Sequence, residues 1–170
     1  MDTFFEQLVP IRKNAKTVTC FLGIWFLALL LIFVCMTFLW YYINTYALLL
    51  VAGVLFGAYK LSMLLFIEYE YIITNGTMDI DKITAKSSRK RVFTFELSQV
   101  ERLERYNPNQ KYGSFDKTVV ACTPDSSSYM MVVTKQGKGS TLIVFSPDER
   151  MKGAMVKFLP KFVANGAFKD

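Results

Sequence analysis

The sequence predicts a membrane α-helical hairpin joined to a mainly β domain that ends in one helix, an α+β arrangement. Three observations predict it. Residues 17–59 include no Asp, Glu, Lys or Arg, so this stretch is apolar enough to enter lipid. After Ile67 apolar and polar residues alternate, as they do in half-buried strands. Near the C-terminus the apolar residues change to the spacing of an amphipathic helix.

Composition divides the chain of 170 residues into three segments. Residues 1–16 are expected to be a short cytoplasmic segment, residues 17–67 a two-helix transmembrane hairpin, and residues 68–170 a cytoplasmic domain. The formal net charge of +6 is modest for a nucleic-acid binder, which needs a dedicated basic face. The same charge suits a protein beside an anionic lipid leaflet, so no nucleic-acid partner is expected.

The membrane segment contains two apolar runs. The first, residues 18–43, exceeds the roughly 20 residues that an α-helix needs to cross a bilayer, and it is too long for the core of a signal peptide. The second covers residues 46–67. Asn44 and Thr45 form the polar link between them. Because this link is so short, the two helices are expected to be antiparallel.

Lys and Arg near the ends of the two runs set the expected orientation, because basic residues are retained on the cytoplasmic side. Arg12, Lys13 and Lys16 precede the first run, and a basic stretch at residues 82–91 follows the second. The link carries no basic residue. We therefore expect a multi-pass protein of the cell membrane with both termini in the cytoplasm. Lys60, inside the second run, can then extend its stem to the inner headgroups.

Two short patterns bear on how this segment packs. Gly53 and Gly57 form a Gly-x-x-x-Gly pair, which allows another helix to approach closely. That helix belongs either to the same chain, which is the simpler interpretation, or to another protomer. Residues 3–9 are expected to form a short interfacial helix that Pro10 ends.

Seven short strands are expected after the hairpin. Residues 68–74 alternate and are rich in Tyr and Ile, and Asn75-Gly76 is a favoured two-residue hairpin turn. Phe93 and Phe95 share one face of the third strand, so both are expected in the core. The expected strands are residues 68–74, 77–84, 91–97, 101–106, 117–123, 129–135 and 141–145.

One amphipathic helix is expected after the strands. Ser146-Pro147-Asp148-Glu149 matches a capping box with Pro at the first helical position. Apolar residues then recur at helical spacing and give the helix one apolar face, and Pro160 ends or kinks it. The residues of this face are Met151, Ala154, Met155, Phe158 and Leu159.

Seven strands followed by one helix is the element order of a pleckstrin-homology-like (PH-like) barrel. Residues 71–75 (Tyr-Ile-Ile-Thr-Asn), a basic stretch, and then Leu97, Val100 and Leu103 resemble bacterial PH-like domains that follow transmembrane helices. The sequence lacks the glycine that those domains often carry in the turn after the second strand. The whole chain resembles bacterial two-pass membrane proteins with a C-terminal PH-like domain. This resemblance implies a barrel with a helix at one open end and with basic rim loops that contact lipid or protein.

No residue pattern indicates catalysis. The chain contains no histidine, so the commonest general base and a frequent metal ligand are missing. Its three cysteines form no Cys-x-x-Cys motif and are expected to be small hydrophobic residues. Asp79 and Asp81 share one strand face and in principle suit a cation, but ordinary outward-facing carboxylates are the expected interpretation. The prediction is a protein that is not an enzyme and has no catalytic residue, no metal and no cofactor.

One basic cluster, consisting of Lys86, Arg89, Lys90 and Arg91, is the candidate site. The second strand returns antiparallel to the first, so the loop that follows it should end near the bilayer. Each Lys or Arg at an anionic surface contributes about 1 kcal/mol to binding, so we expect these side chains to contact lipid headgroups. The alternative is that the charges only set the topology or keep the loop soluble. The two are not exclusive.

Two functions follow from these expectations. The first is a non-enzymatic, membrane-anchored adaptor or binding module whose cytoplasmic domain contacts anionic inner-leaflet lipids or a partner protein. The alternative is an accessory subunit of a membrane transport or envelope complex, held through its transmembrane hairpin. In that case Gly53 and Gly57 would give the specificity, toward a membrane-protein partner or in a homo-oligomer.

Overall fold

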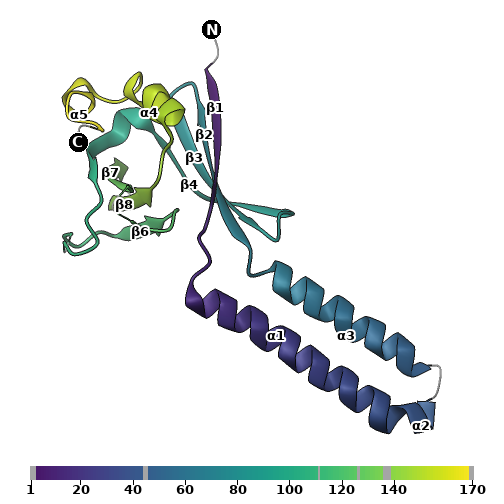
Figure 1. Ribbon diagram of the computed structural model, residues 1–170. Helices are drawn as coiled ribbons and strands as arrows, with labels where there is room; N and C mark the ends of the chain where they lie inside the picture. Colours follow the sequence, from purple (N-terminus) through teal and green to yellow (C-terminus); the bar gives the residue numbers. More distant parts are fainter. Residues whose placement is uncertain (1–2, 44–45, 111, 126, 136–138, 169–170) are drawn as a thin grey trace. The chain divides into compact units, whose positions relative to one another are not determined.

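The computed structural model describes residues 3–43, 46–110, 112–125, 127–135 and 139–168 (Figure 1). Contacts divide the chain into two compact units. The β unit consists of Met1–Ile11, Glu68–Ile83 and Ser88–Asp170, and the helical unit of Arg12–Ile67 and Thr84–Ser87. The expected segment of residues 1–16 is therefore divided between the two units. The β unit is assembled from parts of the chain that precede and follow the helices.

The helical unit contains the two apolar helices that the sequence predicts. The first run forms α1 (Ala15–Val34), a π-helical turn (Cys35–Leu39) and α2 (Trp40–Ile43), and the second forms α3 (Tyr46–Met63). Asn14 caps α1, since its side-chain oxygen accepts a hydrogen bond from the amide of Ala15 at 2.7 Å. Both runs contain a helix that is long and apolar enough to cross a membrane. The expected link at Asn44 and Thr45 lies outside the described residues.

α1 and α3 lie side by side and run in opposite directions, as expected (Figure 1). The side chains buried in this unit are small, which lets the two backbones approach. They are Ala28, Cys35, Ala47, Ala58 and Ser62. Gly53 and Gly57 do not take part in this packing, because a Cβ at either position would meet nothing within 4 Å. The simpler interpretation of the glycine pair, close packing on the first helix of the same chain, is not what the structure has.

The β unit begins with a strand that the sequence did not reveal. β1 (Phe4–Pro10), β2 (Ile67–Thr74), β3 (Thr77–Thr84) and β4 (Ser88–Glu96) form a four-stranded sheet in that order. β1 pairs antiparallel with β2, from Phe4 opposite Thr74 to Pro10 opposite Glu68. The interfacial helix expected at residues 3–9 is therefore wrong. Exposed and half-buried side chains alternate along this segment, which is the period of a strand.

The second sheet contains the remaining strands. β5 (Val100–Arg105), β7 (Tyr129–Lys135), β8 (Gly139–Phe145) and β6 (Lys117–Val120) follow one another across it in that order. A 3-10 turn at Leu97–Gln99 leads from β4 into β5, and β6 pairs with β8 in parallel orientation. The seven strands expected after residue 67 are thus confirmed. The closed barrel is not, because no strand pairing joins the two sheets in the part of the chain that the structure describes.

The core of the β unit joins side chains of both sheets and of the C-terminal helices. Tyr71 is fully buried, its hydroxyl donates a hydrogen bond to the carbonyl of Ala121 at 2.7 Å, and its ring packs edge-on against Phe145. This burial raises the pKa of the Tyr71 phenol. Phe95 is only 2% exposed, as expected, whereas Phe93 is half-buried at the edge of the core.

The C-terminal helix begins later than predicted and is not the only one. α4 spans Glu149–Val156, and its N-cap is Asp148, whose carboxylate accepts a hydrogen bond from the amide of Met151 at 2.7 Å. The capping box based on Ser146 is therefore wrong. The side chain of Gln7 in β1 binds the Ser146 carbonyl at 3.0 Å and the Asp148 amide at 2.9 Å, which holds this segment outside the helix.

A second short helix, α5 (Lys161–Ala164), follows Pro160, so the domain ends in two helices and not in one. Proline lacks an amide hydrogen and cannot continue a helix through its own position. The apolar face predicted for α4 is largely confirmed. Its buried members are Met151, Ala154, Met155 and Leu159.

Candidate functional site

The four residues of the predicted basic cluster do not form one uniform basic surface. Arg89, Lys90 and Arg91 belong to β4, and Lys86 lies in the turn between β3 and β4. All four side chains are exposed. Two of them nevertheless have carboxylate partners on other strands of the same sheet, so their charge is already compensated.

Arg89 pairs with Glu70 of β2 across the first sheet. Its Nη2 lies 2.7 Å from Oε1 of Glu70, whose side chain is 1% exposed. Burial raises the pKa of Glu70, and the neighbouring Glu6 carboxyl on β1 raises it further, whereas the positive charge of Arg89 lowers it. Arg89 therefore stabilises a buried carboxylate, and its removal would leave that charge unpaired.

Arg91 is held by two carboxylates of β3. Its Nε lies 3.0 Å from Oδ1 of Asp81, and its Nη1 lies 3.0 Å from Oδ2 of Asp79. The hydrogen bond with Asp81 raises the pKa of the Arg91 guanidinium. Asp79 and Asp81 are thus partners of an arginine and not ordinary solvent-facing carboxylates. The described residues contain no group of three or more Cys, Asp or Glu side chains placed to hold a metal ion.

Lys86 occupies a tight turn with an unfavourable backbone. Ala85 and Lys86 have φ angles of 55° and 56°, and the amide of Ser87 donates to the carbonyl of Thr84 at 3.2 Å. Glycine or asparagine is favoured at such positions, because a left-handed conformation costs other residues roughly 1–2 kcal/mol each. The missing glycine noted in the sequence therefore does not abolish this turn. Ala85 and Lys86 adopt its conformation at a cost in stability, as residues of functional sites often do.

This turn packs on one end of the helical hairpin. The amide of Ala85 donates to the carbonyl of Phe66 at 3.0 Å, and the ammonium of Lys13 lies 4.9 Å from the centre of the Phe66 ring. Lys16 lies in the first turn of α1, and the helical unit contains no Asp or Glu. We call Lys13, Lys16 and Lys86 the lysine collar. No carboxylate of its own unit neutralises it.

A small crevice of about 140 Å³ opens beside the collar. It lies between the start of α1 and the segment after α3, and its walls are mostly apolar. Lys13 and Thr17 supply the polar groups, and Val18, Phe21, Leu65 and Phe66 the apolar ones. Apolar walls beside an ammonium group match the chemistry of a lipid with an anionic headgroup.

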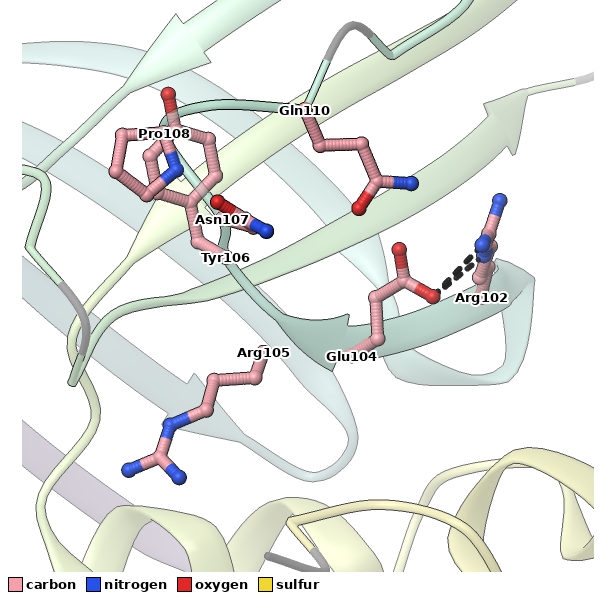
Figure 2. A pocket seen from close by; sticks show the side chains of 7 residues that line it. All are labelled: Arg102, Glu104, Arg105, Tyr106, Asn107, Pro108 and Gln110. Carbon is pink, nitrogen blue, oxygen red and sulfur yellow. Dashed lines mark hydrogen bonds and ion pairs between the residues drawn. The ribbon is translucent and has the colours of Figure 1, made fainter.

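A larger hollow, of about 760 Å³, lies on the β unit at the end of β5 (Figure 2). Figure 2 shows Arg102 and Glu104 pointing toward each other, with a shortest N–O distance of 2.7 Å, whereas Arg105 extends away from them. The Tyr112 hydroxyl accepts a hydrogen bond from the Asn107 amide at 2.7 Å. Among its described residues no nucleophile is paired with a general base.

A family model described as Bacterial PH-like domain (DUF6106) matches residues 1–165. The chain belongs to this family. No curated protein and no solved structure shows a significant match. The predicted resemblance to bacterial PH-like domains is therefore confirmed, and the match extends over β1 and the helical hairpin as well as the strands after it.

The lysine collar of this PH-like protein was only half visible in the sequence. In the sequence, Lys13 and Lys16 indicate the orientation of the hairpin, and Lys86 belongs to a separate basic loop. The missing information was the contact of both regions with Phe66. The sequence does indicate that Asp79 and Asp81 share one face of a strand, where they could pair with a basic side chain. It does not indicate that this side chain is Arg91.

Proposed function

We propose that this PH-like protein is a non-enzymatic binding module, anchored in the cell membrane by its helical hairpin, that contacts anionic lipid headgroups through the lysine collar. Both termini would lie in the cytoplasm, because the collar marks the basic end of the hairpin. The observation that supports this most is that the Lys13 ammonium and the turn that carries Lys86 both contact Phe66, in a unit without acidic residues.

This proposal moves the lipid contact from β4 to the end of the helices. Arg89 and Arg91 have carboxylate partners, so little of their charge is left to attract headgroups. The three lysines of the collar would contribute about 1 kcal/mol each at an anionic surface, and less at physiological salt. The crevice beside them offers apolar walls for the start of an acyl chain.

Lipid selectivity of the whole protein tests this function. The chain, with Trp40→Phe so that Trp25 of α1 is the remaining tryptophan, is reconstituted in vesicles in which either phosphatidylglycerol or phosphatidylcholine carries brominated acyl chains. Quenching of its fluorescence then reports which lipid lies beside α1. We expect stronger quenching by the anionic lipid. The triple variant Lys13→Gln/Lys16→Gln/Lys86→Gln should lose roughly three- to tenfold in this selectivity, since Coulomb attraction supplies it.

The matched control removes three exposed lysines of the β unit, Lys90→Gln/Lys157→Gln/Lys161→Gln. It changes the net charge equally and should retain the selectivity. If the two triple variants lose selectivity to the same extent, the collar is not the lipid contact. Added salt should weaken the selectivity of the wild-type chain.

The open space beside the glycine pair favours a second candidate function, that of an accessory subunit held by its hairpin in a membrane complex or a homo-oligomer. Gly53 and Gly57 have open space beside them, so a helix from another chain has room to approach. We expect Gly53→Leu/Gly57→Leu to leave the monomer folded and to weaken its association in mild detergent. Gly23→Leu, at an equally open position of α1, is the control. Unchanged size of the complex in both variants would argue against this function.

A further inference from the structure

The unclosed barrel leaves two edge strands on either side of one hollow. β4 is the last strand of the first sheet, and β6 is the last strand of the second. A hollow of about 470 Å³ lies between them, and its lining residues are Arg91, Val92, Phe93 and Thr94 of β4, Asp116 and Lys117 at the start of β6, and Thr141 of β8. We call it the edge slot. Ligand pockets in proteins commonly have about 300–1,000 Å³, so the slot is large enough for a peptide segment.

Lys117 bridges the edge slot. Its ammonium lies 3.3 Å from the carbonyl oxygen of Val92 and 5.1 Å from the centre of the Phe93 ring. The Val92 carbonyl of β4 thus accepts a hydrogen bond from a side chain. In an inner strand, such a carbonyl would accept one from the backbone of the next strand. A strand placed between two others needs them roughly 9–10 Å apart, twice the spacing of paired strands. The four-carbon stem of a lysine and its hydrogen bond span a distance of that order.

Charge distinguishes this slot from an ordinary edge. In the part of the chain that the structure describes, no carboxylate lies within ion-pair distance of Lys117, whereas Arg91 on β4 has two. Asp116, beside Lys117, is engaged as well, since its Oδ2 accepts a hydrogen bond from the amide of Ser140 at 2.8 Å. The ammonium of Lys117 therefore remains available for an acidic group that enters the slot.

We propose that the edge slot binds an extended segment of a partner protein as an added strand, with an acidic side chain of that segment on Lys117. An amide of the segment would replace the ammonium on the Val92 carbonyl, and the half-buried ring of Phe93 would pack against an apolar neighbour of the acidic residue. β6 has four residues, which sets the paired length at about 13 Å. Main-chain hydrogen bonds then supply affinity, and Lys117 supplies specificity. This inference does not depend on the lipid contact.

Selection from a displayed library of random octapeptides, with the whole protein in mild detergent as the target, tests the slot. We expect enrichment of peptides with Glu or Asp flanked by Val, Ile or Thr. Synthetic copies should bind the wild-type chain, and a Pro in the paired stretch should abolish binding because it removes an amide donor. Hydrogen exchange of the β4 amides should slow on binding.

Two charge-reversal variants locate the site. Lys117→Glu should weaken the selected peptides at least tenfold, and a second selection on that variant should enrich Lys or Arg in place of the acidic residue. Lys161→Glu, an exposed position on α5, should bind like the wild type. Lys117→Gln, with a melting temperature measured beside it, separates loss of the charge from any loss of folding. No enrichment over the unselected library, or equal binding by the Lys117→Glu and Lys161→Glu variants, would overturn the proposal.

Discussion

A chain in which a two- to four-residue turn replaces residues 12–67 should fold as a soluble β unit, whereas a chain that starts at Glu68 should lose most of its stability. The reason is β1, which precedes the helices and pairs along its whole length with β2. Pro10 and Glu68 are directly opposite each other, so a short turn can connect them. Without β1 the edge of β2 is exposed, and the side chains that pack beneath β1 lose their cover.

Gln7 accounts for part of the stability that is lost without β1. Its side chain binds both the Ser146 carbonyl and the Asp148 amide ahead of α4, and each polar group left unpaired in a buried place costs about 1–3 kcal/mol. Domains of this kind have only about 5–15 kcal/mol in total. Urea unfolding followed by circular dichroism measures the difference. Gln7→Ala should be clearly destabilising in the shortened chain, and the exposed Leu8→Ala should not. Equal stability with and without β1 would show that this strand is dispensable.

Phe95→Ala should destabilise the β unit by about 3–5 kcal/mol, because the lost ring leaves a cavity in a closely packed core. Phe95 is 2% exposed and belongs to the main core cluster. Phe93→Ala should cost less, about 1–2 kcal/mol, since a partly exposed ring contributes less buried area. The two rings lie 5.7 Å apart, so the pair is a matched comparison within one strand. Unfolding of the shortened chain in urea gives both values. A larger loss of unfolding free energy for Phe93→Ala than for Phe95→Ala would contradict this prediction.

Local patterns in the sequence are sufficient to predict most helices and strands, but not which of them contact each other. The apolar runs, the alternation after Ile67 and the Asn75-Gly76 turn, with φ angles of 49° and 88°, all appear in the structure as predicted. Residues 3–9 have no strong period of their own, and only pairing with β2 makes them a strand. The start of α4 shifted for the same reason, because Gln7 engages the segment before Asp148. In both places a tertiary contact overrides a local preference.

The candidate site shows the same division. The sequence identified Lys86, Arg89, Lys90 and Arg91 as basic, which is a matter of composition. It could not reveal that Glu70 and Asp81 would compensate two of them, since those contacts cross from strand to strand. Nor could it reveal which edges of the two sheets stay unpaired, because strand periodicity is the same in an open sheet and in a closed barrel.

The pairing of β1 with β2 constrains how the protein is made. β1 precedes both apolar helices in the chain and its partner β2 follows them, so β1 stays unpaired with β2 until both helices have been synthesised. If the helices cross the membrane, the pairing also requires an even number of crossings, because both strands must end on the same side. Insertion of only one helix would leave β1 and β2 on opposite sides of the membrane. If the helices cross the membrane, completion of the first sheet therefore depends on the insertion of both of them.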